Sequence, residues 1–140
     1  MTLVLKEALI SLGGLNLLVR RVLELDFDEI QAWFEARELK IPDRSLFPKV
    51  GFIVEGVAAG FIYFTDSPVA IIDCYISNPL SDSKYRSEAI TGITEALIVC
   101  AKFHKCKRIK CDSTLGSIKR RALDHGFKST GTYESFIMEI

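Results

Sequence analysis

Hydrophobic positions in the middle of the chain follow two periods, one typical of strands and one typical of a helix. Apolar side chains dominate Val69–Ile76, and this run stops at a Ser-Asn-Pro turn. Over Lys84–Phe103 they recur every three or four residues, which is the spacing of one buried helix face. Strand character returns at Arg108–Cys111. The pattern predicts a strand–helix–strand unit whose two strands are parallel, because a crossover of this length is needed to join parallel strands.

The flanking segments add further strands and helices to this unit. Strands are predicted at Leu15–Leu23, Val50–Glu55 and Val57–Asp66, helices at Asp26–Arg37 and Thr114–Leu123, and a last strand or hairpin over 128–140. Asp26 is the expected N-cap of the first helix, and Gly126 the expected left-handed cap of the second. The fold class is therefore α/β or α+β, with a mixed central sheet of about six or seven strands flanked by helices on both faces.

The N-terminal segment allows two interpretations. Thr2–Leu12 has the pattern of a short helix that stops at Gly13-Gly14, and it fits equally well an appendage that packs on a partner. We expect an N-terminal appendage over 1–14 and a single domain over 15–140.

Composition and charge exclude several classes of protein. The chain has 140 residues, of which 49% are hydrophobic and 26% charged, and its formal net charge is zero. A zero net charge gives no reason to expect a nucleic-acid partner. Charged residues interrupt every long apolar run, so we expect no membrane segment, a cytoplasmic setting and reduced cysteines.

Two local motifs, in the right order, resemble the GNAT superfamily of acetyl-CoA-dependent N-acetyltransferases. One is the strand that ends in Ile76-Ser77-Asn78-Pro79 and is followed by Tyr85-Arg86 at the start of the long helix. The other is the basic helix that closes on Gly126-Phe127. The resemblance runs from about Leu15 to Ile140 and implies a GNAT-like fold with acetyl-CoA as co-substrate.

The resemblance also implies where acetyl-CoA binds. In the family, backbone amides at the start of the central helix hold the pyrophosphate, in an Arg-x-x-Gly-x-Gly/Ala turn. The matching positions here, and hence the expected pyrophosphate site, are Arg86, Ser87, Ala89, Ile90 and Thr91, with alanine and threonine in place of the two glycines. The pantetheine arm is expected along Ile76 and Ser77, at a gap between this strand and Arg108–Cys111. Lys119, with Arg120 and Arg121, either meets the 3′-phosphate of CoA or belongs to a solvated face.

Acetyl transfer to an amine needs a base for the amine and an acid for the leaving thiolate. Asp73, in an otherwise apolar strand, is the candidate base, since burial would raise its pKa. The alternative is a strand residue that faces solvent. Many family members have a tyrosine as the acid where this chain has Ala122, so Tyr133 or Tyr85 would have to replace it.

The cysteines and histidines do not predict a metal site. Cys100, His104, Cys106 and Cys111 lack the paired spacing of a zinc knuckle, and two of these cysteines fall on predicted core faces. Buried free thiols account for them better.

We therefore expect an N-acetyltransferase that uses acetyl-CoA and an amine acceptor that the sequence does not identify. The alternative is a GNAT-like domain without catalysis, which serves as a structural or interaction subunit of a larger assembly. In either case the sequence leaves the oligomeric state open, although the final strand could pair with a second copy of the chain.

Overall fold

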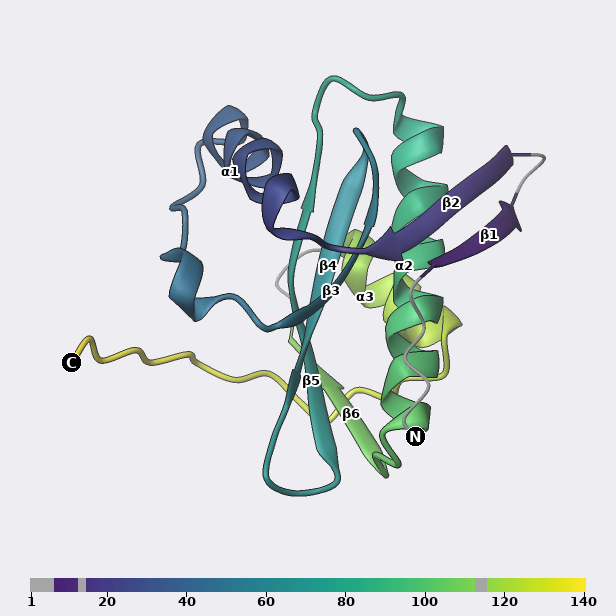
Figure 1. The fold of residues 1–140 in the computed structure, drawn as a ribbon. Coiled ribbons are helices and arrows are strands. Elements are labelled where there is room, and N and C mark those ends of the chain that lie inside the picture. Colours follow the sequence, from purple (N-terminus) through teal and green to yellow (C-terminus); the bar gives the residue numbers. More distant parts are fainter. Residues whose placement is uncertain (1–6, 13–14, 113–115) are drawn as a thin grey trace.

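Six strands form one mixed sheet, and they lie in the sheet in the order in which they occur along the chain. The computed structural model describes residues 7–12, 15–112 and 116–140. The strands are β1 (Glu7–Leu12), β2 (Leu15–Arg21), β3 (Val50–Val54), β4 (Ala58–Phe64), β5 (Val69–Ser77) and β6 (Arg108–Cys111). Neighbours from β1 to β5 pair antiparallel, and only β5 and β6 pair parallel. The predicted mixed sheet is confirmed (Figure 1).

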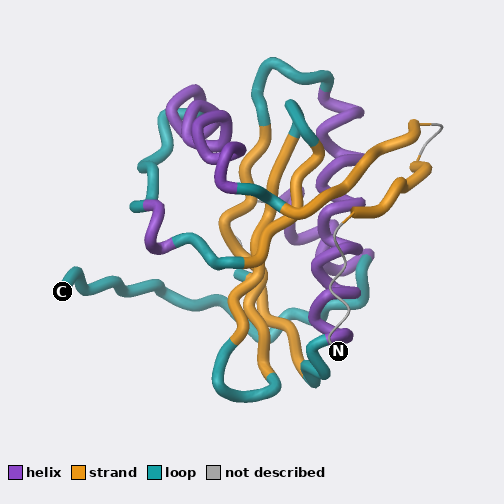
Figure 2. Tube along the Cα trace, viewed as in Figure 1, coloured by secondary structure: helices purple, strands orange, loops and turns teal. Residues whose placement is uncertain are grey.

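Helices cover both faces of this sheet. They are α1 (Phe27–Ala36), α2 (Ser83–Phe103) and α3 (Gly116–Asp124), with short 3-10 turns at η1 (Glu24–Asp26) and η2 (Arg44–Leu46). The core is divided accordingly into one cluster between α1 and the sheet and another between α2 and the sheet. Figure 2 shows the strands between these two helices, as the fold class predicts.

Small residues let α2 lie close to the sheet. Its buried face carries Ala89, Ala96 and Ala101 between larger side chains such as Ile93 and Leu97. These side chains pack against strand residues of the same cluster, among them Phe52, Ile62 and Ile72. Burial of this apolar face, rather than helix propensity alone, holds the 21-residue helix in place.

The predicted N-terminal helix is wrong over the part that the structure describes. Residues Glu7–Leu12 form β1 and pair with β2 from Glu7↔Arg20 to Leu12↔Leu15. A Gly-Gly pair between two apolar runs is a hairpin signal, and pairing with β2 outweighs the local helical pattern. The remainder of the predicted helix, 2–6, and its expected Gly13-Gly14 stop lie outside the described residues.

The end of α3 is formed as predicted, but the strand predicted after it is not. Gly126 has φ +90°, and the Gly126 and Phe127 amides donate to the Leu123 and Ala122 carbonyls, a Schellman cap. Residues 128–140 have no regular secondary structure and are all exposed. Figure 1 shows this segment leaving the body of the protein as an extended chain. The strand prediction is therefore wrong for a single copy of the chain, because these residues pair with no other strand.

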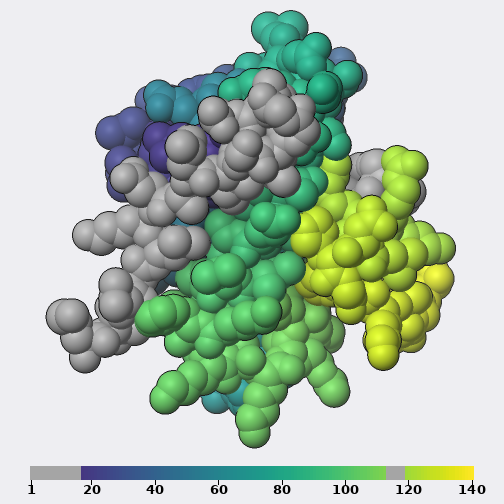
Figure 3. All heavy atoms as spheres, turned by 90° about the vertical axis from the view of Figure 1, so that its right-hand side faces the viewer, coloured from purple at the N-terminus to yellow at the C-terminus, as the bar shows by residue number. Residues whose placement is uncertain are grey.

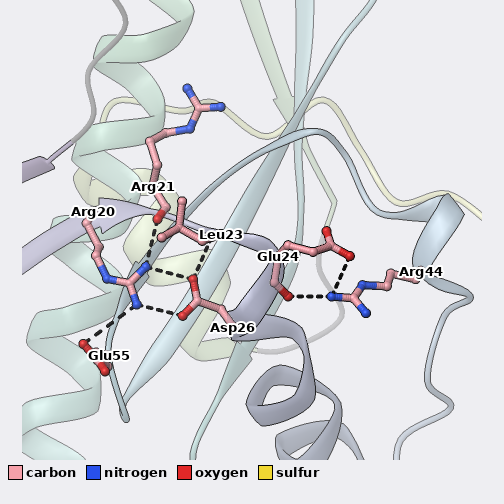
Figure 4. Close-up of polar contacts among 7 residues, drawn as sticks. All are labelled: Arg20, Arg21, Leu23, Glu24, Asp26, Arg44 and Glu55. Atoms are coloured by element: carbon pink, nitrogen blue, oxygen red, sulfur yellow. Dashed lines mark hydrogen bonds and ion pairs between the residues drawn. The ribbon is translucent and has the colours of Figure 1, made fainter.

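Asp26 is a buried ion-pair residue and not the expected side-chain cap of α1. Its carboxylate accepts hydrogen bonds from both terminal nitrogens of Arg20, at 2.8 and 2.7 Å, and from the Leu23 amide at 2.6 Å (Figure 4). It makes no capping bond to α1. The Arg20 guanidinium beside it lowers the pKa of this carboxyl, and the pair fixes the chain between β2 and α1.

Candidate functional site

A bulge distorts β5 halfway along its length. Phe61 pairs with Asp73 and Ala59 pairs with Ile76, so two residues of β5 stand opposite Gly60 alone. The first of the two, Cys74, has φ +59°. Bulges of this kind bend a strand and re-aim its side chains.

The residue opposite the bulge has to be glycine. The ring of Tyr75 lies over Gly60, and a Cβ added there would be 2.6 Å from ring atom Cε1. The ring is also held from the other end, because the Tyr75 hydroxyl is 2.7 Å from Thr94 Oγ1 on α2. This contact ties the bulge to the middle of the long helix.

The described pairing of β5 with β6 is short. Their pairing covers only Val69–Ile72 with Arg108–Cys111. Beyond this point, Ile76 and Ser77 pair with β4, and no other strand of the described chain adjoins Cys74–Ser77. Within the described residues, this edge of β5 therefore has no partner strand, at the place where the family resemblance implies a gap.

A cavity of about 320 Å³ lies between α2 and α3. It is lined by Ser87 and Thr91 of α2 and by Arg120, Arg121, Asp124 and His125 at the end of α3. Figure 3 shows α3 directly beside α2. Arg121 Nη2 donates to Ser87 Oγ at 3.0 Å, and burial lowers the pKa of this guanidinium. Two guanidinium groups and two hydroxyls against one carboxylate make the cavity suitable for an anion such as a phosphate.

The start of α2 differs from the expected phosphate turn. The helix begins at Ser83, and the Asp82 carboxylate accepts from the Lys84 and Tyr85 amides at 3.0 and 3.2 Å. Arg86 turns back and donates to the Pro79 and Ser81 carbonyls. Residues 86–91 are therefore inside the helix, where each amide bonds the carbonyl four residues earlier.

The expectation that backbone amides from Arg86 onwards face a cleft is consequently wrong. Of the five residues expected at the pyrophosphate, only Ser87 and Thr91 line the cavity, through their side chains. Ala89 is fully buried against the sheet, and Ile90 packs on the same cluster.

The other expected binding residues lie in three places. Ile76 is buried in the α1-side cluster, and Ser77 receives hydrogen bonds from Arg37 on its carbonyl, at 2.8 Å, and its hydroxyl, at 2.7 Å. Lys119 is exposed and does not line the cavity. Its neighbours Arg120 and Arg121 do line the cavity. Arg120 lies four residues before Asp124, and Arg121 four residues before His125, so these residues share one face of the helix end. This spacing is the feature of the sequence that distinguishes the two arginines from Lys119.

The two candidate catalytic residues are both exposed. Asp73 Oδ1 accepts from the Cys74 amide at 2.7 Å, and of the two interpretations of this carboxylate the one that faces solvent is confirmed. Tyr133 is 71% exposed on the C-terminal segment, and its hydroxyl donates to the Thr130 carbonyl at 2.7 Å. Neither side chain hydrogen-bonds the other or the cavity, so a single copy of the chain does not bring them together.

Burial controls the titration of the groups around the bulge. It raises the pKa of the Cys74 thiol to about 11, with the nearby Asp73 charge as a second cause. Burial also raises the pKa of the Tyr75 hydroxyl to about 12. Both groups are protonated near neutral pH, so Cys74 is not an activated nucleophile.

The described residues provide neither a metal site nor a helix that could cross a membrane. Among the residues that the structure describes, no three His, Cys, Asp or Glu side chains are grouped to hold a metal ion. Within the same residues, no helix combines the length and the apolarity that crossing a membrane requires.

Comparison with known proteins supports the fold. No family model and no curated protein matches the sequence. Among solved structures, TTHA1254 from Thermus thermophilus is similar, with a TM-score of 0.65, 11% identity and coverage of 86% of this chain and 96% of that chain. An aminoglycoside acetyltransferase from a soil metagenome, solved with trehalose, has a TM-score of 0.53 at 16% identity, covering 87% of this chain and 93% of its own. AAC(6')-Iy, solved with a bisubstrate analogue of CoA and acetylneamine, has a TM-score of 0.53 at 14% identity. The match covers 87% of this chain and 97% of that chain. The chain therefore has a GNAT-like fold.

Proposed function

We propose that this protein is an N-acetyltransferase that uses acetyl-CoA and an amine acceptor. The proposal depends on the observation that, among the described residues, β5 pairs with β6 only as far as Ile72 and Cys111. One edge of Cys74–Ser77 thus has no partner strand in this part of the chain, and an extended pantetheine arm with amide groups could add to such an edge as another strand would. The fold supports the same activity, since two similar structures are acetyltransferases.

The cavity between α2 and α3 would hold the phosphates of CoA. Arg120 and Arg121 supply the positive charge, and Ser87 and Thr91 supply hydroxyl donors one helical turn apart. This arrangement replaces the glycine-rich turn by side chains. It also explains how the chain can do without glycines at 89 and 91.

Acetyl-CoA would bring the thioester whose C–S bond breaks as the acetyl carbon bonds to the amine nitrogen. The amine must lose a proton, and Asp73 is the carboxylate proposed to accept it, directly or through water. Its exposure on the bulge gives an acceptor access to it. Tyr133 is the proposed proton donor to the departing thiolate.

Titration with CoA and acetyl-CoA in a thermal-unfolding assay tests the binding step. A ligand present at about 100 times its Kd stabilises the folded state by about 2.7 kcal/mol, which raises the Tm of a domain of this size by roughly 8 °C. We expect Arg121→Glu to abolish the rise. Lys119→Glu is the matched control, because it makes the same charge change on the same helix outside the cavity, and it should retain most of the rise.

Transfer itself requires a second measurement. Thiol release from acetyl-CoA is followed with and without a panel of primary amines. An amine-dependent increase supports the proposal, and binding of CoA without any such increase would argue against catalysis.

The second candidate function is a GNAT-like subunit without catalysis. The closed start of α2 favours it, because Asp82 already occupies the amides of Lys84 and Tyr85 that a diphosphate would otherwise meet. A Tm that does not change at millimolar CoA would overturn the transferase proposal and leave this one.

A further inference from the structure

A second cavity lies at the end of the sheet where β5 and β6 begin (Figure 1). Its volume is about 370 Å³, which is in the range of pockets that bind small organic groups. The turn between β4 and β5 supplies one wall, residues 64–68, and the end of α2 supplies the other, residues 104–106. Backbone hydrogen bonds hold the two walls together, because the Lys107 and Arg108 amides donate to the Pro68 carbonyl at 2.8 and 3.2 Å.

A fixed aromatic platform forms part of this cavity. The His104 ring stacks on the Phe64 ring, with the ring centroids 4.2 Å apart and the planes 24° from parallel. His104 Nδ1 donates to the Cys100 carbonyl at 2.9 Å, so the ring is held in two ways. His104 is exposed, and since Phe64 covers one ring face, the accessible part is the other face and the edge. A planar ring that enters the cavity can therefore stack on His104.

Basic side chains surround the cavity. Five of the nine residues from 102 to 110 are exposed cations, namely Lys102, Lys105, Lys107, Arg108 and Lys110. Among the described residues, none of the ion pairs involves them. The helix dipole accounts for Lys102 in the last turn of α2, but Arg108 and Lys110 belong to β6. In a chain of zero formal net charge, this local concentration of cations indicates a site for an anionic partner.

The backbone at Lys105 is strained in a way that glycine would relieve. Lys105 has φ +58°, at the position after α2 where a Schellman cap favours glycine. Its amide donates to the Lys102 carbonyl at 3.0 Å, and the Cys106 amide donates to the Ala101 carbonyl at 3.0 Å, which completes this cap. A side chain kept in a left-handed conformation points to a function for that side chain. Here it places an ammonium group beside the cavity.

We propose that this end of the protein binds single-stranded nucleic acid. One base enters the cavity and stacks on His104, and the neighbouring phosphates lie against Lys105, Lys107 and Arg108. Cations that follow the backbone and an aromatic ring that stacks a base are the two recurring parts of such sites. The carboxylate that lines the cavity, Asp66, can accept a hydrogen bond from an exocyclic amino group of the base.

A membrane surface and a nucleic-acid duplex fit these features less well. A bilayer supplies phosphates, but no planar group that could enter a cavity between two loops. The bases of a duplex are stacked on one another, whereas those of a single strand are open to His104. The site is also separate from the proposed CoA site, because Ser87 and His104 are 17 residues apart along α2, or about 26 Å. The two proposals can therefore be tested independently.

Fluorescence anisotropy of a labelled single-stranded oligonucleotide of mixed sequence tests the proposal. Contact with three phosphates predicts a slope of about −2 for the logarithm of the association constant against that of the salt concentration, a loss of about twentyfold between 50 and 200 mM salt. Lys107→Ala should reduce the slope to about −1.4, whereas Lys40→Ala, at an exposed lysine in the loop after α1, should not change it. A slope that Lys107→Ala leaves unchanged would overturn the proposal. So would the absence of binding at about 100 μM protein in 50 mM salt, including the case in which only phosphatidylserine vesicles bind.

His104→Ala separates stacking from charge. Loss of one stacked base should weaken binding by about 5- to 150-fold with the salt slope unchanged, because the phosphate contacts remain. Phe103→Ala is the matched control, since this side chain is 47% exposed on the same turn but does not line the cavity, and it should retain the affinity. Thermal unfolding checks that both variants are folded. Equal losses for the two variants, or no loss for His104→Ala, would overturn the base site.

Discussion

The buried pair of Arg20 and Asp26 allows a sharp prediction about stability. Asp26 is only 4% exposed and receives three hydrogen bonds, two of them from the guanidinium (Figure 4). Asp26→Asn keeps the shape and one acceptor oxygen, but it leaves the Arg20 charge with only the exposed Glu55 carboxylate, 3.8 Å away. Removal of one member of a buried pair costs about 3–5 kcal/mol, and the partial exposure of Arg20 puts the expected loss near the lower limit, about 3 kcal/mol.

A matched control comes from the second ion pair of the same region. Arg44 Nη2 lies 2.8 Å from Glu24 Oε1, but the Glu24 side chain is 83% exposed. Exposed pairs contribute about 0–1 kcal/mol, so Glu24→Gln should change the free energy of unfolding by less than 1 kcal/mol. Urea unfolding at pH 7 measures both variants. A loss below 1 kcal/mol for Asp26→Asn would refute the assignment of Asp26 as a stabilising buried partner.

The same pair sets a direction for pH dependence. The pKa of Asp26 is lowered in the folded protein, with the Arg20 hydrogen bond as the largest cause. Its stabilisation is therefore complete above the pKa of the unfolded chain, near 3.9, and is lost as pH falls through the lower pKa of the folded state. The difference between wild type and Asp26→Asn should be constant above about pH 5 and should shrink below pH 4. A difference that stays constant down to pH 2 would contradict the lowered pKa.

Three further predictions concern the bulge and the cavity. Gly60→Ala should destabilise the fold by about 2 kcal/mol in urea unfolding, because the new methyl group meets the tethered Tyr75 ring. Asp73→Asn should slow amine-dependent thiol release and leave the CoA-induced rise in Tm unchanged, whereas Arg121→Glu should remove that rise. With a pKa of about 11, Cys74 should have about one thousandth of its thiol ionised at pH 8. The rate of its alkylation should therefore increase about tenfold per pH unit up to pH 11, and mass spectrometry measures this rate.

The strongly periodic parts of the fold could be predicted from the sequence. α2 and the β3–β4 hairpin form as expected, because their apolar positions carry one clear period each. For the segment that forms β1, a helix is one of the two interpretations that the sequence allows, because a short apolar run does not distinguish helix from strand; pairing with β2 decides for the strand. Residues 128–140 contain an apolar run that predicts a strand, but in the described chain they pair with no other strand.

The candidate site was harder to predict, because bulges and contacts between helices have no local period. Regular alternation after Ile72 would direct Cys74 towards α2 and Tyr75 towards α1. The bulge reverses both directions, since Cys74 packs on the α1 side and Tyr75 on the α2 side. Likewise, the contact of Arg121 with Ser87 joins residues 34 positions apart. Spacing could select a face of α3, but it could not show which helix that face meets.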